Sequence, residues 1–216
     1  PYLPHQGRKR RIYGTAKEKS RYQAAKRSIT ERPTIVGART RIGDWEGDTI
    51  VGKERTQRIL THVERVSLYL VADKLDTTTC DAVHKRTATH MKKLLCHTIT
   101  YDNGSEFAKE FEVACQKLHL ERYWSRVKTP KDNPVNERFN RTLQEEFIDL
   151  GNFNPDTVLF NHNLTEWLIE YTFIRPHQTL GYLTPWQFYC QTNHVKSKVL
   201  PMYPSSTDTC FIYCLW

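Results

Sequence analysis

The 216-residue sequence lacks several features that define whole classes of protein. No apolar run approaches the roughly 18 residues that a membrane-spanning helix needs, so we expect no membrane partner. No charged segment is followed by an apolar segment and a small-residue cleavage site, so we expect no secretion. A hydrophobic content of 38% with 26% charged residues is typical of a globular protein rather than a disordered one.

Cysteine motifs for metal or disulfide sites are also missing. The six cysteines are scattered, no Cys-x-x-Cys pair is present, and Cys210 and Cys214 have no histidines at zinc-finger spacing. We therefore expect reduced thiols in a cytoplasmic protein. His84 and His90 are six residues apart and do not share the helix face that i,i+4 metal ligands use. The histidines are interpreted as surface or capping residues.

Acidic residues are scarce at the start of the chain. Residues 1–41 hold two acids, Glu18 and Glu31, against twelve basic residues. Because the whole chain has 32 Lys and Arg and 24 Asp and Glu, residues 42–216 hold 20 basic and 22 acidic residues. A basic arm thus precedes a nearly neutral body, which favours binding to a polyanion. A solvated tail without a partner is the alternative.

The apolar pattern beyond residue 41 predicts an α/β fold. Strands are expected over residues 45–53, 58–66, 67–75, 97–102 and 120–124, the first three as an antiparallel meander because their junctions are short. Helices are expected from a Thr-rich cap at 77–79 to about Leu95, after Ser105, over 135–147 and over 158–173. This order matches the ribonuclease-H-like architecture, a mixed five-stranded sheet flanked by helices, but it also fits other α/β domains.

Three acids stand at positions suited to a shared site. Asp48 lies in the first strand, Asp102 ends the fourth strand and Glu137 lies early in a helix. An ionised carboxylate beside a core strand is costly unless it is paired or bound to a cation. Three carboxylates without a matching His or Cys set favour Mg²⁺ or Mn²⁺, and two such ions serve hydrolysis and transfer of phosphodiesters. Each acid could equally be a turn residue, a helix cap or a salt-bridge partner.

Three sequence blocks resemble those of a known family. Residues 41–48 (RIGDWEGD), 101–107 (YDNGSEF) and 136–143 (NERFNRTL) resemble the signature blocks of the integrase catalytic core. This core occurs in bacterial insertion-sequence transposases and retroviral integrases, the DDE superfamily. Residues 175–185 (RPHQTLGYLTP) resemble a segment that often follows the core in bacterial members. The 34 residues between Asp102 and Glu137 are close to the usual interval of that family.

The resemblance implies a ribonuclease-H-like fold and a bacterial, nucleoid-associated transposase that cleaves DNA and transfers the cut strand. It implies that Asp48, Asp102 and Glu137 are catalytic and bind two Mg²⁺ or Mn²⁺ ions. It also selects Asp48 over Asp44 and Glu46, which strand alternation cannot separate, and leaves these two a supporting role. The implied partners are the DNA ends of the element, target DNA and further copies of the chain in a homo-oligomer on DNA.

Five basic residues near Glu137 are candidates for contact with DNA phosphates: Arg126, Lys128, Lys131, Arg138 and Arg141. Arg141 is one helical turn beyond Glu137 and shares its face, so a phosphate contact is favoured there. Pairing of Arg141 with Glu137 or Glu145 is the alternative. For the other four residues, a solvated basic surface is equally compatible with the sequence.

The expected organisation is a basic arm over residues 1–41, an integrase-type core with a helical extension over 42–191 and an irregular tail over 192–216. No helix-turn-helix that could select element ends is recognisable before Trp45. A truncated or repurposed DNA-binding protein that no longer transposes is therefore the alternative function. A ribonuclease-H-type nuclease acting on RNA–DNA hybrids is the third.

Overall fold

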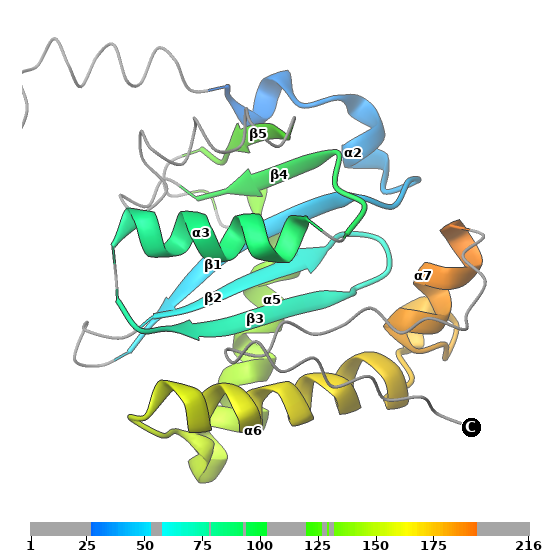
Figure 1. Cartoon of the computed structure of the whole chain (residues 1–216). Helices are drawn as coiled ribbons and strands as arrows, with labels where there is room; N and C mark the ends of the chain where they lie inside the picture. Colours follow the sequence, from blue (N-terminus) through cyan, green and yellow to red (C-terminus); the bar gives the residue numbers. More distant parts are fainter. Residues whose placement is uncertain are drawn as a thin grey trace, which may run out of the picture.

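A computed structural model describes residues 27–52, 58–77, 79–92, 94–102, 120–126, 129 and 132–193. Its centre is a five-stranded sheet in the order β3-β2-β1-β4-β5 (Figure 1). The strands are β1 (Asp44–Val51), β2 (Arg58–Glu64), β3 (Leu70–Leu75), β4 (Thr98–Tyr101) and β5 (Glu121–Trp124). The first three pair antiparallel, whereas β4 is parallel to β1 and β5 is parallel to β4. The expected meander and mixed sheet are confirmed.

Helices cover both faces of this sheet (Figure 1). Helix α3 (Cys80–Met91) begins at Thr79, whose side chain accepts a hydrogen bond from the Ala82 amide. Its buried Val83 and Met91 belong to the same apolar cluster as Trp45 of β1. Helix α5 (Pro134–Leu143) lies on the opposite face and continues as the π-helical segment η4 (Gln144–Asn152). Its apolar stripe, Val135, Phe139 and Leu143, packs on Ile59, Val63 and Leu70 of the sheet.

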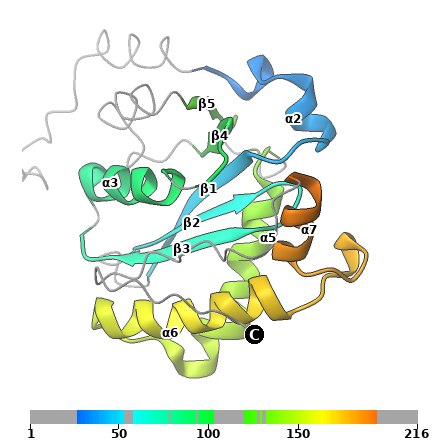
Figure 2. The same cartoon turned by 45° about the vertical axis from the view of Figure 1, so that its right-hand side comes forward.

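Helix α6 (Thr157–Ile169) covers the edge strand β3. Asn161 accepts from the Lys74 amide at 2.7 Å and donates to the Lys74 carbonyl at 3.0 Å, as a neighbouring strand would. This contact satisfies backbone groups of an edge strand, which would otherwise be open to pairing with another chain. Beyond η5 (Glu170–Ile174) and η6 (Gln178–Leu180), helix α7 (Pro185–Asn193) packs Trp186 and Tyr189 on Tyr69, between β2 and β3 (Figure 2).

Residues 27–41, which the sequence analysis assigned to the basic arm, contact the sheet. Ser28 forms a parallel bridge with Trp124 at the outer edge of β5, and the Trp124 amide donates to the Arg27 carbonyl at 2.9 Å. The short helices η1 (Ile29–Glu31) and α2 (Thr34–Ala38) follow, and Val36 is buried. The helix expected after Ser105 and nearly all of the expected tail lie outside the described residues. Within the part that is described, no helix is both long and apolar enough to cross a membrane.

Candidate active site

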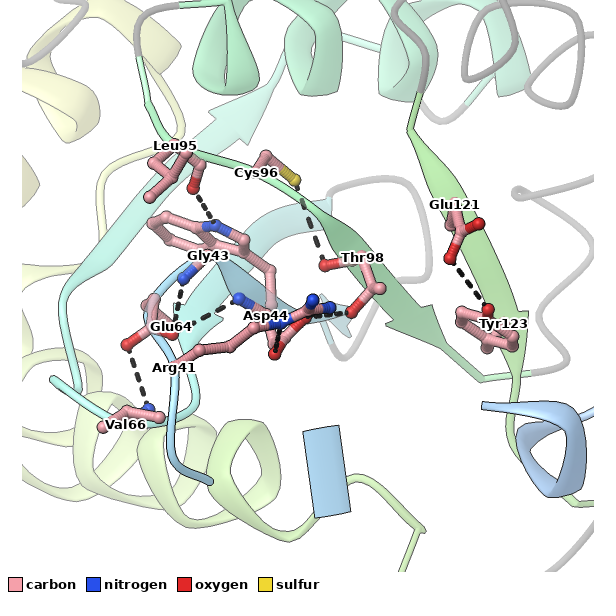
Figure 3. Close-up of polar contacts among 11 residues, drawn as sticks. Arg41, Gly43, Asp44, Glu64, Val66, Leu95, Cys96, Thr98, Glu121 and Tyr123 are labelled. Atoms are coloured by element: carbon pink, nitrogen blue, oxygen red, sulfur yellow. Dashed lines mark hydrogen bonds and ion pairs between the residues drawn. The ribbon is translucent and has the colours of Figure 1, made fainter. Parts of the chain in front are cut away.

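The first acid of β1, Asp44, is held entirely by protein groups. Arg41 donates to its carboxylate from Nε and Nη2, each at 2.9 Å, and Thr98 donates from Oγ1 at 2.7 Å (Figure 3). The hydrogen bond to Asp44 raises the pKa of Arg41. Beside it, buried Glu64 accepts from the amides of Gly43 at 3.1 Å and Val66 at 2.9 Å (Figure 3). These acids therefore join the start of β1 to β4 and to the end of β2.

The second acid, Glu46, fastens helix α5 to β1. Its side chain is fully buried, and Arg65 donates to Oε1 at 2.8 Å. The amides of Val135 and Asn136, in the first turn of α5, donate to Oε2 at 2.8 and 2.9 Å. A carboxylate here satisfies two unpaired amides and opposes the positive end of the helix dipole. Burial raises the pKa of Glu46, while Arg65 and the two amides act in the opposite direction.

The third acid, Asp48, lies at the end of the sheet where the parallel strands finish. Gly47 is the last residue of β1 paired with β4, and its partner is Tyr101. Asp48 and Asp102 therefore each follow the same pair, on neighbouring strands about 4.8 Å apart. Because Tyr101 belongs to the cluster on the α3 face, alternation directs Asp102 to the α5 face, which Asp48 also faces. Half-buried Asp48 accepts a hydrogen bond from Asn140 of α5 at 2.9 Å.

Three asparagines hold α5 along β1 and thereby place Glu137. Their side-chain amides donate from Asn133 to the Gly47 carbonyl at 3.2 Å, from Asn136 to the Glu46 carbonyl at 3.0 Å, and from Asn140 to Asp48. Glu137 lies within this stretch of helix, with its side chain exposed. No role for these asparagines was predicted from the sequence, although their spacing at i, i+3 and i+7 marks one helix face.

The donors at this edge suit a hard divalent cation, because they are carboxylates on two strand ends and a neighbouring helix. The structure brings Asp48 and Asp102 to the same edge, with the helix that carries Glu137 beside them. Across the described residues, however, no three His, Cys, Asp or Glu side chains form a group that could hold a metal ion. The catalytic triad and its two ions therefore stay a prediction.

The five candidate DNA contacts are placed differently. Arg126 forms a two-pronged ion pair with Asp132, with N–O distances of 2.7 and 3.0 Å, and its backbone amide also donates to Asp132 at 2.8 Å. These contacts lower the pKa of Asp132, and they indicate a structural use for Arg126. Arg138 and Arg141 are exposed on α5. Lys128 and Lys131 lie outside the described residues, so a DNA contact stays a prediction for all five.

The interpretation of the histidines as surface or capping residues is wrong for two of them. His62 and His90 are buried, with 0% and 2% of their surfaces exposed. Both ring nitrogens of each have a hydrogen-bonding neighbour, which makes burial of an imidazole tolerable. The spacing of the histidines in the sequence could not indicate this burial, because the hydrogen-bonding partners come from different strands and from helix α3.

The fold is the ribonuclease-H-like fold of integrase catalytic cores. The catalytic core domain of BIV integrase matches with a TM-score of 0.57 and 21% identity, over 71% of this chain and 97% of that chain. The simian T-cell lymphotropic virus intasome in complex with PP2A regulatory subunit B56 gamma matches with a TM-score of 0.57 and 22% identity, over 77% and 59%. These likenesses confirm the expected fold class.

Sequence comparison, unlike the comparison of folds, matches the chain to bacterial proteins that are named as transposases. Residues 120–185 match the integrase core domain family. The chain is 33% identical over 186 residues to the transposase for insertion sequence element IS4351 of Bacteroides fragilis, covering 85% of this chain and 56% of that protein. It is 33% identical over 158 residues to the probable transposase for insertion-like sequence element IS1161 of Streptococcus salivarius, covering 72% and 44%.

The chain therefore carries an integrase-type core related to those of DDE-type insertion-sequence transposases, and the resemblance drawn from its sequence blocks is confirmed. It spans about half the length of the curated relatives that it matches.

Proposed function

We propose that this chain performs the chemistry of DNA transposition, cutting DNA strands and joining the cut end to a target DNA. The observation that carries the proposal is the pairing of Gly47 with Tyr101, which puts Asp48 and Asp102 directly after the last pair of the parallel β1–β4 ladder. The contact of Asn140 with Asp48 adds the helix that carries Glu137 to the same edge. The similarity to transposases supports assigning DNA chemistry to this edge.

In this proposal, Asp48, Asp102 and Glu137 hold two Mg²⁺ or Mn²⁺ ions. When bound, such ions activate a hydroxyl nucleophile and stabilise the leaving oxygen of a phosphodiester. The protein positions these ligands and needs no covalent nucleophile. Asn140 fixes the rotamer of Asp48 through its hydrogen bond. The hydrogen bonds from the first amides of α5 to Glu46 keep Glu137 at the edge of the sheet. Arg138 and Arg141 on the exposed side of α5 neutralise phosphates without reading bases.

The proposed partners are the DNA ends of an element and a target DNA. Joining of two ends to one target requires at least two catalytic sites, so we propose a homo-oligomer on DNA.

A strand-transfer assay tests the proposal without knowledge of the element ends. Donor duplexes with randomised terminal sequence and a free 3′-hydroxyl are incubated with the 216-residue chain, supercoiled plasmid and Mg²⁺ or Mn²⁺, and the joined junctions are sequenced. We expect junctions that require the metal and are lost in Asp48→Asn, Asp102→Asn and Glu137→Gln. The matched control is Glu166→Gln, which removes an exposed charge on α6.

The alternatives give different outcomes in the same assay. Salt-sensitive DNA binding without nicking or joining would identify a repurposed DNA-binding protein. Cleavage of an RNA–DNA hybrid without any joining would identify a nuclease of the ribonuclease H type. Full activity in one of the three carboxylate variants would remove that residue from the site.

A further inference from the structure

A row of buried polar side chains crosses the face of the sheet that helix α3 covers. Asp73 of β3 contacts His90 of α3, with 2.6 Å between Oδ2 and Nε2. The Nδ1 atoms of His90 and His62 lie 3.0 Å apart, and His62 Nε2 lies 2.7 Å from the Tyr101 hydroxyl. All four residues are at most 2% exposed. The row therefore joins β3, α3, β2 and β4 through three consecutive hydrogen bonds.

Gly47 allows this row to pass over β1. It pairs with His62 on one side and with Tyr101 on the other, so it occupies the sheet position between them. A Cβ atom at residue 47 would lie 2.2 Å from Cε1 of Tyr101, which is far closer than any real contact. The ring of Tyr101 thus lies against the backbone of Gly47, and the missing side chain lets its hydroxyl reach His62.

The protonation of His62 is consistent with a fixed row. Burial lowers its pKa well below the usual value, with a further contribution from His90, so the ring is neutral. A neutral imidazole has one N–H and one lone pair. His90 contacts Nδ1 of His62, and Tyr101 contacts Nε2 at 2.7 Å, with Thr87 Oγ1 farther from Nε2 at 3.4 Å, so both ring nitrogens have partners. In a low-dielectric interior such satisfied chains are rigid, whereas a break leaves a buried polar group without a partner.

The row ends next to the proposed active site. Tyr101 directly precedes Asp102, and Gly47, which the ring of Tyr101 contacts, directly precedes Asp48. A shift of Tyr101 would therefore move the ends of β1 and β4 relative to each other. A purely apolar core could fill the same volume, but it would not define one position of the Tyr101 ring along the sheet.

We propose that Tyr101 and His62 are positioning residues, which hold Asp48 and Asp102 at the separation that a divalent cation requires. Gly47 is also required, because the absence of a side chain at this position lets the hydroxyl of Tyr101 reach His62. This inference rests on the proposed function. It adds that the geometry of the site is controlled from the opposite face of the sheet.

Direct Mn²⁺ binding to the full chain tests the inference independently of DNA cleavage. Free Mn²⁺ is measured by electron paramagnetic resonance at pH 7 for the wild type, Tyr101→Phe, His62→Leu and the double variant. The matched control is Tyr69→Phe, the same change in the same apolar cluster but beyond the opposite end of β1. Melting temperatures are measured for all five proteins.

We expect the Mn²⁺ dissociation constant to rise roughly three- to tenfold in Tyr101→Phe, less than the tenfold or more typical of direct partners of metal ligands. His62→Leu should give a similar rise, and the double variant no more than either single variant, because all three lose the same hydrogen bond. Tyr69→Phe should stay within twofold of the wild type.

A dissociation constant that follows melting temperature across all variants, the control included, would overturn the inference in favour of a general structural role. Unchanged Mn²⁺ binding in both single variants would also overturn the inference. That result would leave the proposed function intact. If Tyr101→Phe fails to fold, His62→Leu decides alone. A wild-type chain that neither binds Mn²⁺ nor cuts DNA would remove the proposed function, and this inference with it.

Discussion

The three acids along β1 lie on the same face of the strand but in different surroundings. Asp44 and Glu46 are at most 2% exposed, and arginine, threonine or backbone amide donors surround them. Asp48, two residues beyond Glu46 on the same face, is half-buried and accepts from the Thr49 amide at 2.7 Å and from the Asn140 side chain at 2.9 Å. Burial, rather than position in the strand pattern, distinguishes Asp44 and Glu46 from Asp48, which is the proposed metal ligand.

This difference has a simple electrostatic basis. A buried carboxylate is tolerated when cationic or N–H groups replace its lost hydration, as Arg65 and two helix amides do for Glu46. On the strand beside β1, Asp102 brings a second carboxylate to the edge that carries Asp48. In the proposed site, a bound divalent ion would offset the charge of these two carboxylates, as Arg65 and the helix amides offset that of Glu46.

The strongest test of the comparison is Asp48→Asn. We expect strand transfer to fall at least a thousandfold, about 4 kcal/mol in activation free energy, because a proposed metal ligand loses its charge. The melting temperature should change little, since an amide oxygen can still accept from Asn140. Joined products are quantified by sequencing and unfolding by calorimetry. Unfolding of the variant under assay conditions would place Asp48 with the structural acids.

Glu46→Gln makes the same chemical change two residues earlier and should have the opposite profile. It leaves the Arg65 guanidinium buried without its partner charge, which typically costs about 3–5 kcal/mol of folding free energy. Urea unfolding monitored by circular dichroism measures this loss. Mn²⁺ affinity per folded molecule should change less than in Asp48→Asn. Wild-type stability would show that Arg65 finds another partner.

Asn140→Ala should give a smaller effect that is confined to the site. Partners that orient metal ligands typically contribute ten- to hundredfold in metal affinity, so we expect the Mn²⁺ dissociation constant to rise about tenfold. Asn154→Ala, which removes an asparagine side chain near the start of α6, is the control. An unchanged dissociation constant in Asn140→Ala would mean that Asp48 needs no such support.

The two arginines Arg141 and Arg126 extend the comparison to DNA binding. Arg141→Ala should weaken binding to any duplex and reduce the slope of log K against log salt by about 1, as loss of one phosphate contact does. Arg126→Ala should change the slope less, because Arg126 is already paired with Asp132. Fluorescence anisotropy between 50 and 200 mM salt, roughly the useful range, measures both. Equal slopes for the two variants would reject this distinction.

The smallest expected effect is a pH dependence at Asp132. Its folded pKa is lowered by Arg126, so the ion pair stabilises the fold above the ordinary aspartate pKa of about 4 and is lost as pH falls through the folded pKa. Asp132→Asn should therefore be less stable than the wild type at pH 7, with a gap that closes in acid. Chemical unfolding across this pH range measures the gap. A gap that persists in acid would point to lost hydrogen bonds rather than lost charge.

Local patterns in the sequence predicted most of the described fold. The apolar strands and their short junctions predicted the meander, and Thr79 was among the predicted cap residues of α3. The strand predicted over residues 120–124 is β5, in which Tyr123 and Trp124 are buried. These features depend on neighbours in the chain, which periodicity and capping rules describe.

Contacts between distant residues could not be predicted in this way. Glu46 and the first amides of α5 are 89 and 90 residues apart, and the partners of His62 lie 28 and 39 residues away. Nothing in a single sequence reports such pairs. The choice of Asp48 over Asp44 and Glu46 came from the resemblance alone, and the register of β1 and β4 supplied the physical reason that Asp48 and Asp102 belong to one edge.

The bridge between Ser28 and Trp124 also fixes the point on the sheet from which residues 1–26 extend. Trp124 pairs with Tyr101, so Arg27 is anchored at the same edge of the sheet as Asp48 and Asp102. Residues 1–26 carry eight basic residues and one acid, and in any conformation they extend no more than about 90 Å from this anchor. If this charge binds a DNA duplex, as the sequence predicts, the duplex would be held at a high effective concentration near the proposed cutting site, without recognition of its sequence.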